Sequence, residues 1–137
     1  MEYLTATEFL SEEYFFNSFN RGNKTFFGEN FDYIYKNLYG VKGGMEGEYD
    51  VVLINCTSIG IIETKYRGRD NDYRQILKIP QSFRDIFQHY ANHKIYLGYA
   101  AFSFKKETEQ FYIDNGIAII KQVGDTIIIQ DEHLKTF

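Results

Sequence analysis

The chain has 137 residues, of which 44% are hydrophobic and 25% charged, a composition typical of a globular protein large enough to close a core. A net charge of −4 argues against a surface that attracts polyanions on all sides, and no apolar run approaches the ~18 residues of a membrane span. Cys56 is the single cysteine, and the first ten residues lack a basic segment followed by an apolar run. We therefore expect a cytoplasmic protein without a secretory signal.

Hydrophobic spacing and turn residues predict a single α/β domain over residues 1–137, with a central mixed sheet flanked by helices. The expected order is helix 6–20, strands 26–42, 48–55 and 58–66, helix 70–90, strand 94–104, helix 106–115, and strands 117–123 and 126–130. Pro80 interrupts the second helix, where an interior proline costs about 3 kcal/mol, so we expect a kink or a fresh helical start there.

The stretch EYDVVLINCTSIGIIETK predicts a β-hairpin with its turn at residues 56–57. Such a turn pairs residues whose numbers sum to 113, so Asp50 faces Glu63 at the open end. Because strand residues two apart share a face, Tyr49 and Val51 are expected together on the opposite face.

Like charges that face each other across two strands are destabilising, so the Asp50–Glu63 pair needs a physical reason. A divalent cation between the carboxylates is one reason, since magnesium binds oxygen ligands from one or two carboxylates. The other possibility is a solvated strand end, in which Glu48 and Lys65 form a salt bridge.

Asp50 followed twelve residues later by Glu63-Thr64-Lys65 resembles the metal-binding core of the PD-(D/E)XK nuclease superfamily. The order of helix, three strands, helix and strand likewise resembles the restriction endonuclease-like core. The segments KIYLGYAAFSF and DNGIAIIKQVGD extend the similarity to small uncharacterised bacterial members, over most of residues 6–130.

This resemblance implies a site in which Asp50, Glu63 and the Thr64 carbonyl bind Mg²⁺, with Mn²⁺ as a substitute. Lys65 would orient the attacking water or stabilise charge on the phosphoryl oxygens. Catalytic residues would then be Asp50, Glu63, Lys65 and an acid of the first helix.

Glu8 is our candidate for the first-helix acid, with Glu12 and Glu13 as alternatives. Glu48 is a possible auxiliary residue, either as a ligand of a second metal ion or as an anchor for Lys65.

A basic run follows the hairpin directly and supplies the candidate nucleic-acid-binding residues Arg67, Arg69, Arg74 and Lys78. A run of this kind also fits a solvated helix face. Its position directly after the hairpin makes it a candidate for contacts with phosphates.

The resemblance therefore implies a metal-dependent phosphodiester hydrolase that acts on nucleic acid, most simply DNA; we expect no membrane partner and a homodimer. A catalytically degenerate nuclease fold that binds nucleic acid or a protein is the alternative function. A structural or regulatory dimer with a solvated hairpin end is the third.

Overall fold

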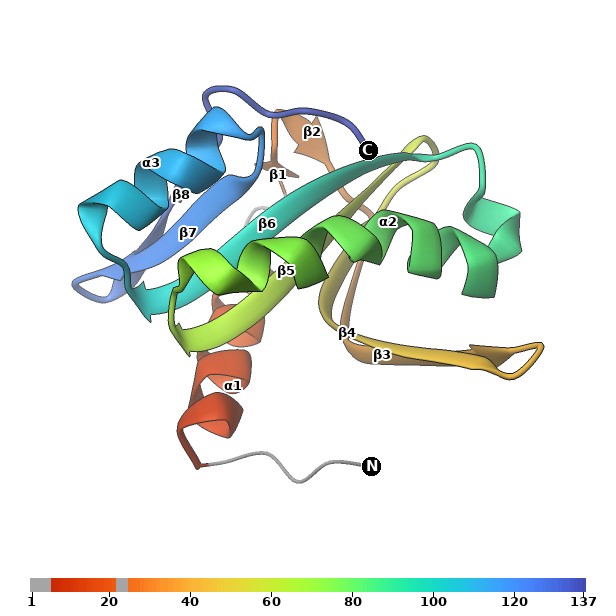
Figure 1. The fold of residues 1–137 in the computed structure, drawn as a ribbon, viewed down its shortest axis with the longest axis horizontal. Helices are drawn as coiled ribbons and strands as arrows, with labels where there is room; N and C mark the ends of the chain where they lie inside the picture. Colours follow the sequence, from red (N-terminus) through yellow and green to blue (C-terminus); the bar gives the residue numbers. More distant parts are fainter. Residues whose placement is uncertain (1–5, 22–24) are drawn as a thin grey trace.

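The computed structural model describes residues 6–21 and 25–137 and contains a six-stranded sheet with helices on both faces (Figure 1). The strands of this sheet are β3 (Tyr33–Lys42), β4 (Met45–Ile54), β5 (Ser58–Arg67), β6 (Lys94–Ser103), β7 (Ala118–Val123) and β8 (Thr126–Gln130). The helices are α1 (Ala6–Asn20), α2 (Tyr73–Ile86) and α3 (Lys106–Asp114). Two short strands, β1 (Thr25–Phe26) and β2 (Glu29–Asn30), form a separate hairpin.

The six strands lie side by side in chain order, β3-β4-β5-β6-β7-β8. The β3–β4, β4–β5 and β7–β8 pairs are antiparallel, whereas β5–β6 and β6–β7 are parallel. The predicted mixed α/β sheet is thereby confirmed.

Two predicted elements differ in detail from the observed ones. The strand expected over 26–42 is split into the β1–β2 hairpin and β3. The helix expected over 70–90 is α2, with a short 3₁₀ turn at each end (Asp70–Asp72 and Gln88–Tyr90), and α2 continues through Pro80. Pro80 is itself buried among the core-facing residues of α2, so the packing of the helix offsets the missing backbone N–H.

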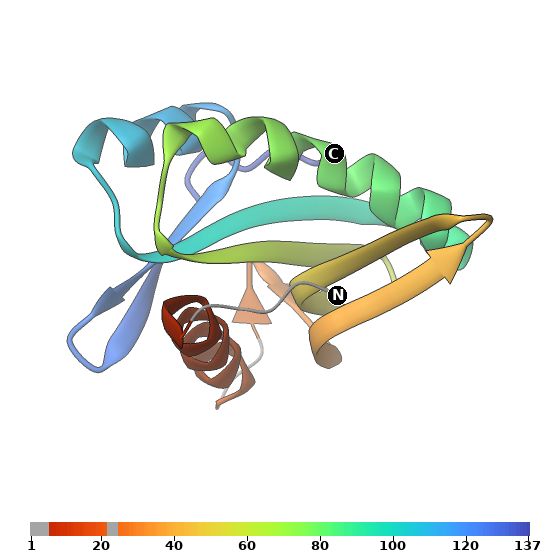
Figure 2. The same ribbon diagram turned by 60° about the horizontal axis from the view of Figure 1, so that its bottom comes forward.

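The sheet separates two hydrophobic cores. Phe15 and Phe19 of α1 pack against one face, and Ile76 and Phe83 of α2 pack against the other. Figure 2 shows α1 on one side of the sheet, with α2 and α3 on the other. The central strands β5 and β6 are buried on both faces, which accounts for their nearly continuous apolar sequences.

The strand β4 bends at Asp50. Tyr49 lies in the core beneath α2, whereas Val51, two residues later, lies in the core beneath α1. The expectation that these two residues share a face is therefore wrong, because strict alternation holds only for a strand without a bend.

Beyond this bend the outer half of the β3–β4 hairpin leaves the sheet and lies against the end of α2 (Figure 1). The Tyr49 hydroxyl hydrogen-bonds with the Ser82 hydroxyl of α2 at 2.9 Å. Gly40 pairs with Gly47 across the hairpin at this contact. A Cβ atom at Gly40 would lie 2.6 Å from side-chain atoms of both Ile86 and Phe87, so the close approach requires glycine.

Within residues 6–21 and 25–137, the helices are all too short or too polar to cross a membrane.

The contact at Gly40 predicts a stability effect. Gly40→Val should lower the free energy of unfolding by about 1–3 kcal/mol, because its side chain would overpack the junction with α2. Denaturant unfolding followed by circular dichroism measures the change. Val41→Ala at the next position, which is 60% exposed, is the control and should shift stability by less than ~0.5 kcal/mol. Equal midpoints for all three proteins would mean that the hairpin does not rest on α2.

Candidate active site

Asp50 lies where β4 separates from β5. The ladder between these strands ends at Val51 and Ile62, while β5 stays paired with β6 as far as Arg67. The pairs that do form have the expected sum of 113, so the predicted register is confirmed.

The Asp50 carboxylate accepts two hydrogen bonds in the gap between the strands. The Thr64 backbone N–H donates to Oδ2 at 2.9 Å, and the Thr64 hydroxyl donates to the same oxygen at 3.1 Å. Thr64 is only 5% exposed, so its N–H would be costly to leave without a partner once β4 departs. The carboxylate accepts the hydrogen bond that a backbone carbonyl of a paired strand would otherwise accept, and this contact fixes its orientation.

Glu12 reaches the same carboxylate from α1. Its side chain belongs to the buried face of the helix and is 7% exposed. The Glu12 carboxyl donates a hydrogen bond to Asp50, an arrangement that requires a proton on Glu12. Glu8, the sequence candidate, lies one helical turn earlier and is partly exposed, so the buried acid that contacts Asp50 is one of the two alternatives.

Lys36 of β3 lies close to this group, and its charge acts to lower the pKa of Glu12 against the larger effects of burial and the neighbouring acids. Its ammonium pairs with Glu13 and lies 5.9 Å from the ring centroids of both Phe9 and Phe16. Glu13 is thus engaged with a lysine at the rim of the site.

Glu63 and Lys65 extend from β5. The Lys65 ammonium lies 3.8 Å from the Glu63 carboxylate, and the two side chains are 34% and 27% exposed, respectively. Glu48 is exposed on β4 and pairs across the ladder with Tyr39 of β3. Among the described residues Lys65 pairs with Glu63 and not with Glu48, so the Glu48–Lys65 salt bridge of the solvated-end alternative does not form, because β4 has left β5 at that level.

A fourth acid, Asp72, stands just before α2 and acts electrostatically on Glu63. The Tyr99 hydroxyl donates a hydrogen bond to Asp72 and accepts one from the Arg69 N–H at 3.0 Å. Tyr99 is fully buried and lies beside Glu63 in the β5–β6 ladder. Sequence analysis missed Asp72 and Tyr99, since neither lies in a motif.

Burial raises the pKa values of Glu12, Asp50 and Glu63, and neighbouring negative charge adds to this effect for Glu12 and Glu63. Burial first, and then the charge of Asp50, raise the pKa of Glu12 to about 7 and that of Glu63 to about 8. Burial also raises the pKa of Asp50, although the Thr64 hydrogen bonds and the charge of Lys65 act in the opposite direction. When these acids are ionised, the site holds more negative charge than its lysines balance.

Oxygen ligands with uncompensated charge are suited to a hard divalent cation. In the part of the chain that the structure describes, no three His, Cys, Asp or Glu side chains already surround a common point where a metal ion could be held. Magnesium needs fewer protein ligands, since it keeps several waters and uses one or two carboxylates. Asp50 and Glu63 fit that requirement, with Glu12 alongside.

The basic residues predicted to bind nucleic acid lead away from the acids. Arg67 and Arg69 follow Lys65 at the carboxyl end of β5, and Arg74 and Lys78 are one turn apart on α2. All four side chains are exposed.

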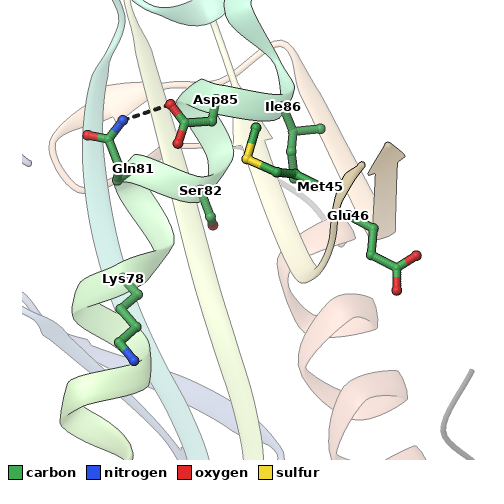
Figure 3. A pocket seen from close by; sticks show the side chains of 7 residues that line it. All are labelled: Met45, Glu46, Lys78, Gln81, Ser82, Asp85 and Ile86. Atoms are coloured by element: carbon green, nitrogen blue, oxygen red, sulfur yellow. Dashed lines mark hydrogen bonds between the residues drawn. The ribbon is translucent and has the colours of Figure 1, made fainter. Parts of the chain in front are cut away.

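A separate pocket of about 440 Å³ lies between α2 and the start of β4 (Figure 3). Its lining side chains are Met45, Glu46, Lys78, Gln81, Ser82, Asp85 and Ile86. The Gln81 amide donates to Asp85 at 2.8 Å on its wall. The acids that surround Asp50 do not line this pocket, so it is distinct from the candidate active site.

Comparison with solved structures gives a match to the crystal structure of a repair endonuclease from Pyrococcus abyssi, with a TM-score of 0.54 and 17% sequence identity. The match covers 89% of this chain and 49% of the endonuclease chain, so this chain spans about half of that protein's length. No protein-family model and no curated protein sequence matches the chain. At this identity the match shows the fold alone, and it confirms the restriction endonuclease-like architecture.

The repulsion among the acids predicts a pH-dependent effect of Asp50→Asn. The raised pKa values of Glu12 and Glu63 mean that the folded protein binds more protons than the unfolded chain between about pH 4.5 and about pH 8. Stability from this source is present below pH 4.5 and is lost as the pH rises through that window. Removing the Asp50 charge relieves the repulsion, so Asp50→Asn should raise Tm at pH 8 by a few degrees. This shift corresponds to a gain on the order of 1 kcal/mol in the free energy of unfolding.

Asparagine suits the position because its oxygen can accept from Thr64 and its amide can donate to Glu12. Thermal unfolding of the metal-free protein at pH 5 and pH 8 measures the effect, which should be larger at pH 8. Asp125→Asn, at an exposed turn residue, is the matched control and should change Tm at neither pH. A lower Tm for Asp50→Asn at pH 8 would contradict the electrostatic account.

Proposed function

We propose that this protein is a metal-dependent phosphodiester hydrolase of the PD-(D/E)XK type that acts on DNA. The observation that carries the proposal is the meeting of Asp50, Glu63 and Lys65 where β4 leaves β5. The buried Glu12 from α1 joins them. The similarity of the fold to a repair endonuclease supports the same reaction class.

In this proposal Asp50 and Glu63 hold Mg²⁺, with Glu12 taking the part that the sequence analysis gave to Glu8. The Thr64 carbonyl is a further candidate ligand. Bound there, the ion would lower the pKa of a water and offset charge that develops on the phosphodiester.

The residues of the chain contribute orientation and charge. Thr64 holds the Asp50 carboxylate in one direction through its N–H and hydroxyl. Lys65, tethered by Glu63, can place its ammonium against a phosphoryl oxygen or hold the attacking water. Glu48 stays an auxiliary candidate, since its charge acts on Glu12.

The proposal places the nucleic acid along the exposed basic residues Arg67, Arg69, Arg74 and Lys78, which lead from the acids along α2. It also includes a homodimer, because a chain of this size offers one copy little surface to hold a duplex.

The first test is cleavage of DNA by the purified protein, which should need Mg²⁺ or Mn²⁺ and stop with EDTA. Lys65→Ala should abolish cleavage and leave the fold intact, because a partly exposed ion pair contributes little stability. Lys94→Ala is the matched control: Lys94 also lies 3.8 Å from a glutamate, Glu29, but at the opposite end of the parallel strands. Equal cleavage by the wild type and Lys65→Ala would show that the activity lies elsewhere.

Metal binding gives this test an independent readout. Mn²⁺ should raise Tm of the wild type by binding to the folded state, and should raise it much less in Asp50→Asn. Metal binding without cleavage would favour the degenerate nuclease fold, whereas no metal effect on either protein would remove the basis of the hydrolase proposal.

The second test concerns the basic residues. Changing both Arg67 and Arg69 to Glu should weaken DNA binding for all sequences alike and flatten its dependence on salt, because phosphate contacts release counterions. Fluorescence anisotropy with duplexes of unrelated sequence, in EDTA, measures this effect. Lys94→Glu with Lys135→Glu makes the same change of charge at exposed residues near the other end of the parallel strands, and should weaken binding far less. If both double variants bind equally, the nucleic acid follows another path.

A further inference from the structure

We infer that Asn37 of β3 is a positioning residue for Asp50, through a backbone conformation that bends both strands of the hairpin at one level. This inference rests on the proposed function and deepens it, since it assigns a role in the same site to a residue outside the proposed metal ligands and basic residues. Four observations on β3 and β4 support it.

Asn37 and Asp50 stand opposite each other in the hairpin. The β3–β4 pairs all have numbers that sum to 87, including Lys36 with Val51 and Leu38 with Tyr49. By the same sum Asn37 would pair with Asp50, but this pair is missing from the ladder. The disturbance in the ladder therefore coincides with the central acid of the site.

Asn37 has a left-handed backbone, with φ of +51° inside a strand. Side chains with a Cβ avoid this region, and asparagine and aspartate tolerate it better than most others. Within a ten-residue strand that stays paired with β4 on both sides of it, Asn37 interrupts the extended backbone.

Asn37 also carries a buried side-chain oxygen, Oδ1, that has no hydrogen-bond partner in the described structure. An unpaired buried oxygen and a left-handed conformation each cost stability. Both fall on one residue, so the fold tolerates two unfavourable features at the position opposite Asp50. Such features gather where function requires a particular geometry.

The bend has a visible consequence in β4. Tyr49 and Val51, on either side of Asp50, enter opposite cores, and the β4–β5 ladder stops at Val51. Asp50 therefore lies at the turning point, where its carboxylate reaches the Thr64 N–H in place of a neighbouring strand. An extended residue 37 would let the hairpin continue flat along β5, with Asp50 as an ordinary member of the ladder.

The experiment separates backbone from side chain with Asn37→Gly, Asn37→Asp and Asn37→Ala. Glycine adopts positive φ freely and aspartate tolerates it, whereas alanine resists it. The primary readout is hydrogen exchange of the Thr64 amide by NMR, which reports the bond to Asp50 whether or not the protein cuts DNA. We expect slow exchange in the wild type and in the Gly and Asp variants, and exchange roughly tenfold faster or more in the Ala variant.

A local effect must be distinguished from general loss of stability. The Leu97 amide in the central strand β6 should exchange equally slowly in all the variants. Asn92→Ala removes a carboxamide from an exposed residue with negative φ, and should leave the exchange rate of the Thr64 amide unchanged. If Asn37→Ala does not fold, Asn37→Ser takes its place in the comparison with Asn37→Gly.

Cleavage kinetics supply the second readout: kcat should fall in the Ala variant with KM for DNA unchanged, and should recover in Asn37→Gly. Unchanged Thr64 exchange in the Ala variant would overturn the inference. Equally fast Thr64 exchange in the Gly and Ala variants would overturn it too, because the side chain of residue 37 and not its backbone conformation would then matter. A wild type that does not cut DNA would refute the proposed function alone, since the exchange measurement still decides the role of Asn37.

Discussion

Where a strand separates from its neighbour in a sheet, the buried backbone groups of that neighbour need other hydrogen-bond partners. When β4 separates from β5, the buried Thr64 N–H loses its place in the ladder, and the Asp50 carboxylate accepts that hydrogen bond instead. This contact fixes the direction of Asp50 and keeps the gap between the strands open. The approach of Glu12 from one side of the sheet and of Glu63 from β5 both depend on that gap.

The acids are held together against their mutual repulsion because different elements supply them. Glu12 is fixed by the packing of α1, and Glu63 by a strand paired along its length with β6. The packing of two cores therefore supports an arrangement that the isolated side chains would avoid. Raised pKa values in such a cluster of buried acids are typical of functional sites.

Much of the fold followed from the sequence. Alternating and continuous apolar runs located the strands that later proved to form the sheet, and the hairpin register was correct where the strands pair. The assignment of faces failed at Tyr49 and Val51, because the bend at Asn37 and Asp50 has no signature in an alternating pattern. The continuous helix through Pro80 was likewise a result of packing that local propensity opposes.

The sequence by itself determined which residues could act together along the chain: Asp50, Glu63 and Lys65 are joined by a hairpin, and strand geometry relates them without further information. Tertiary structure alone decided which acid of α1 joins them, since Glu8, Glu12 and Glu13 have the same chemistry and differ only in the face of the helix that meets the sheet. It also brought in Asp72 and Tyr99, and it paired Lys65 with Glu63. Contacts between elements distant in sequence depend on how the layers pack, and a local pattern of residues carries no record of that packing.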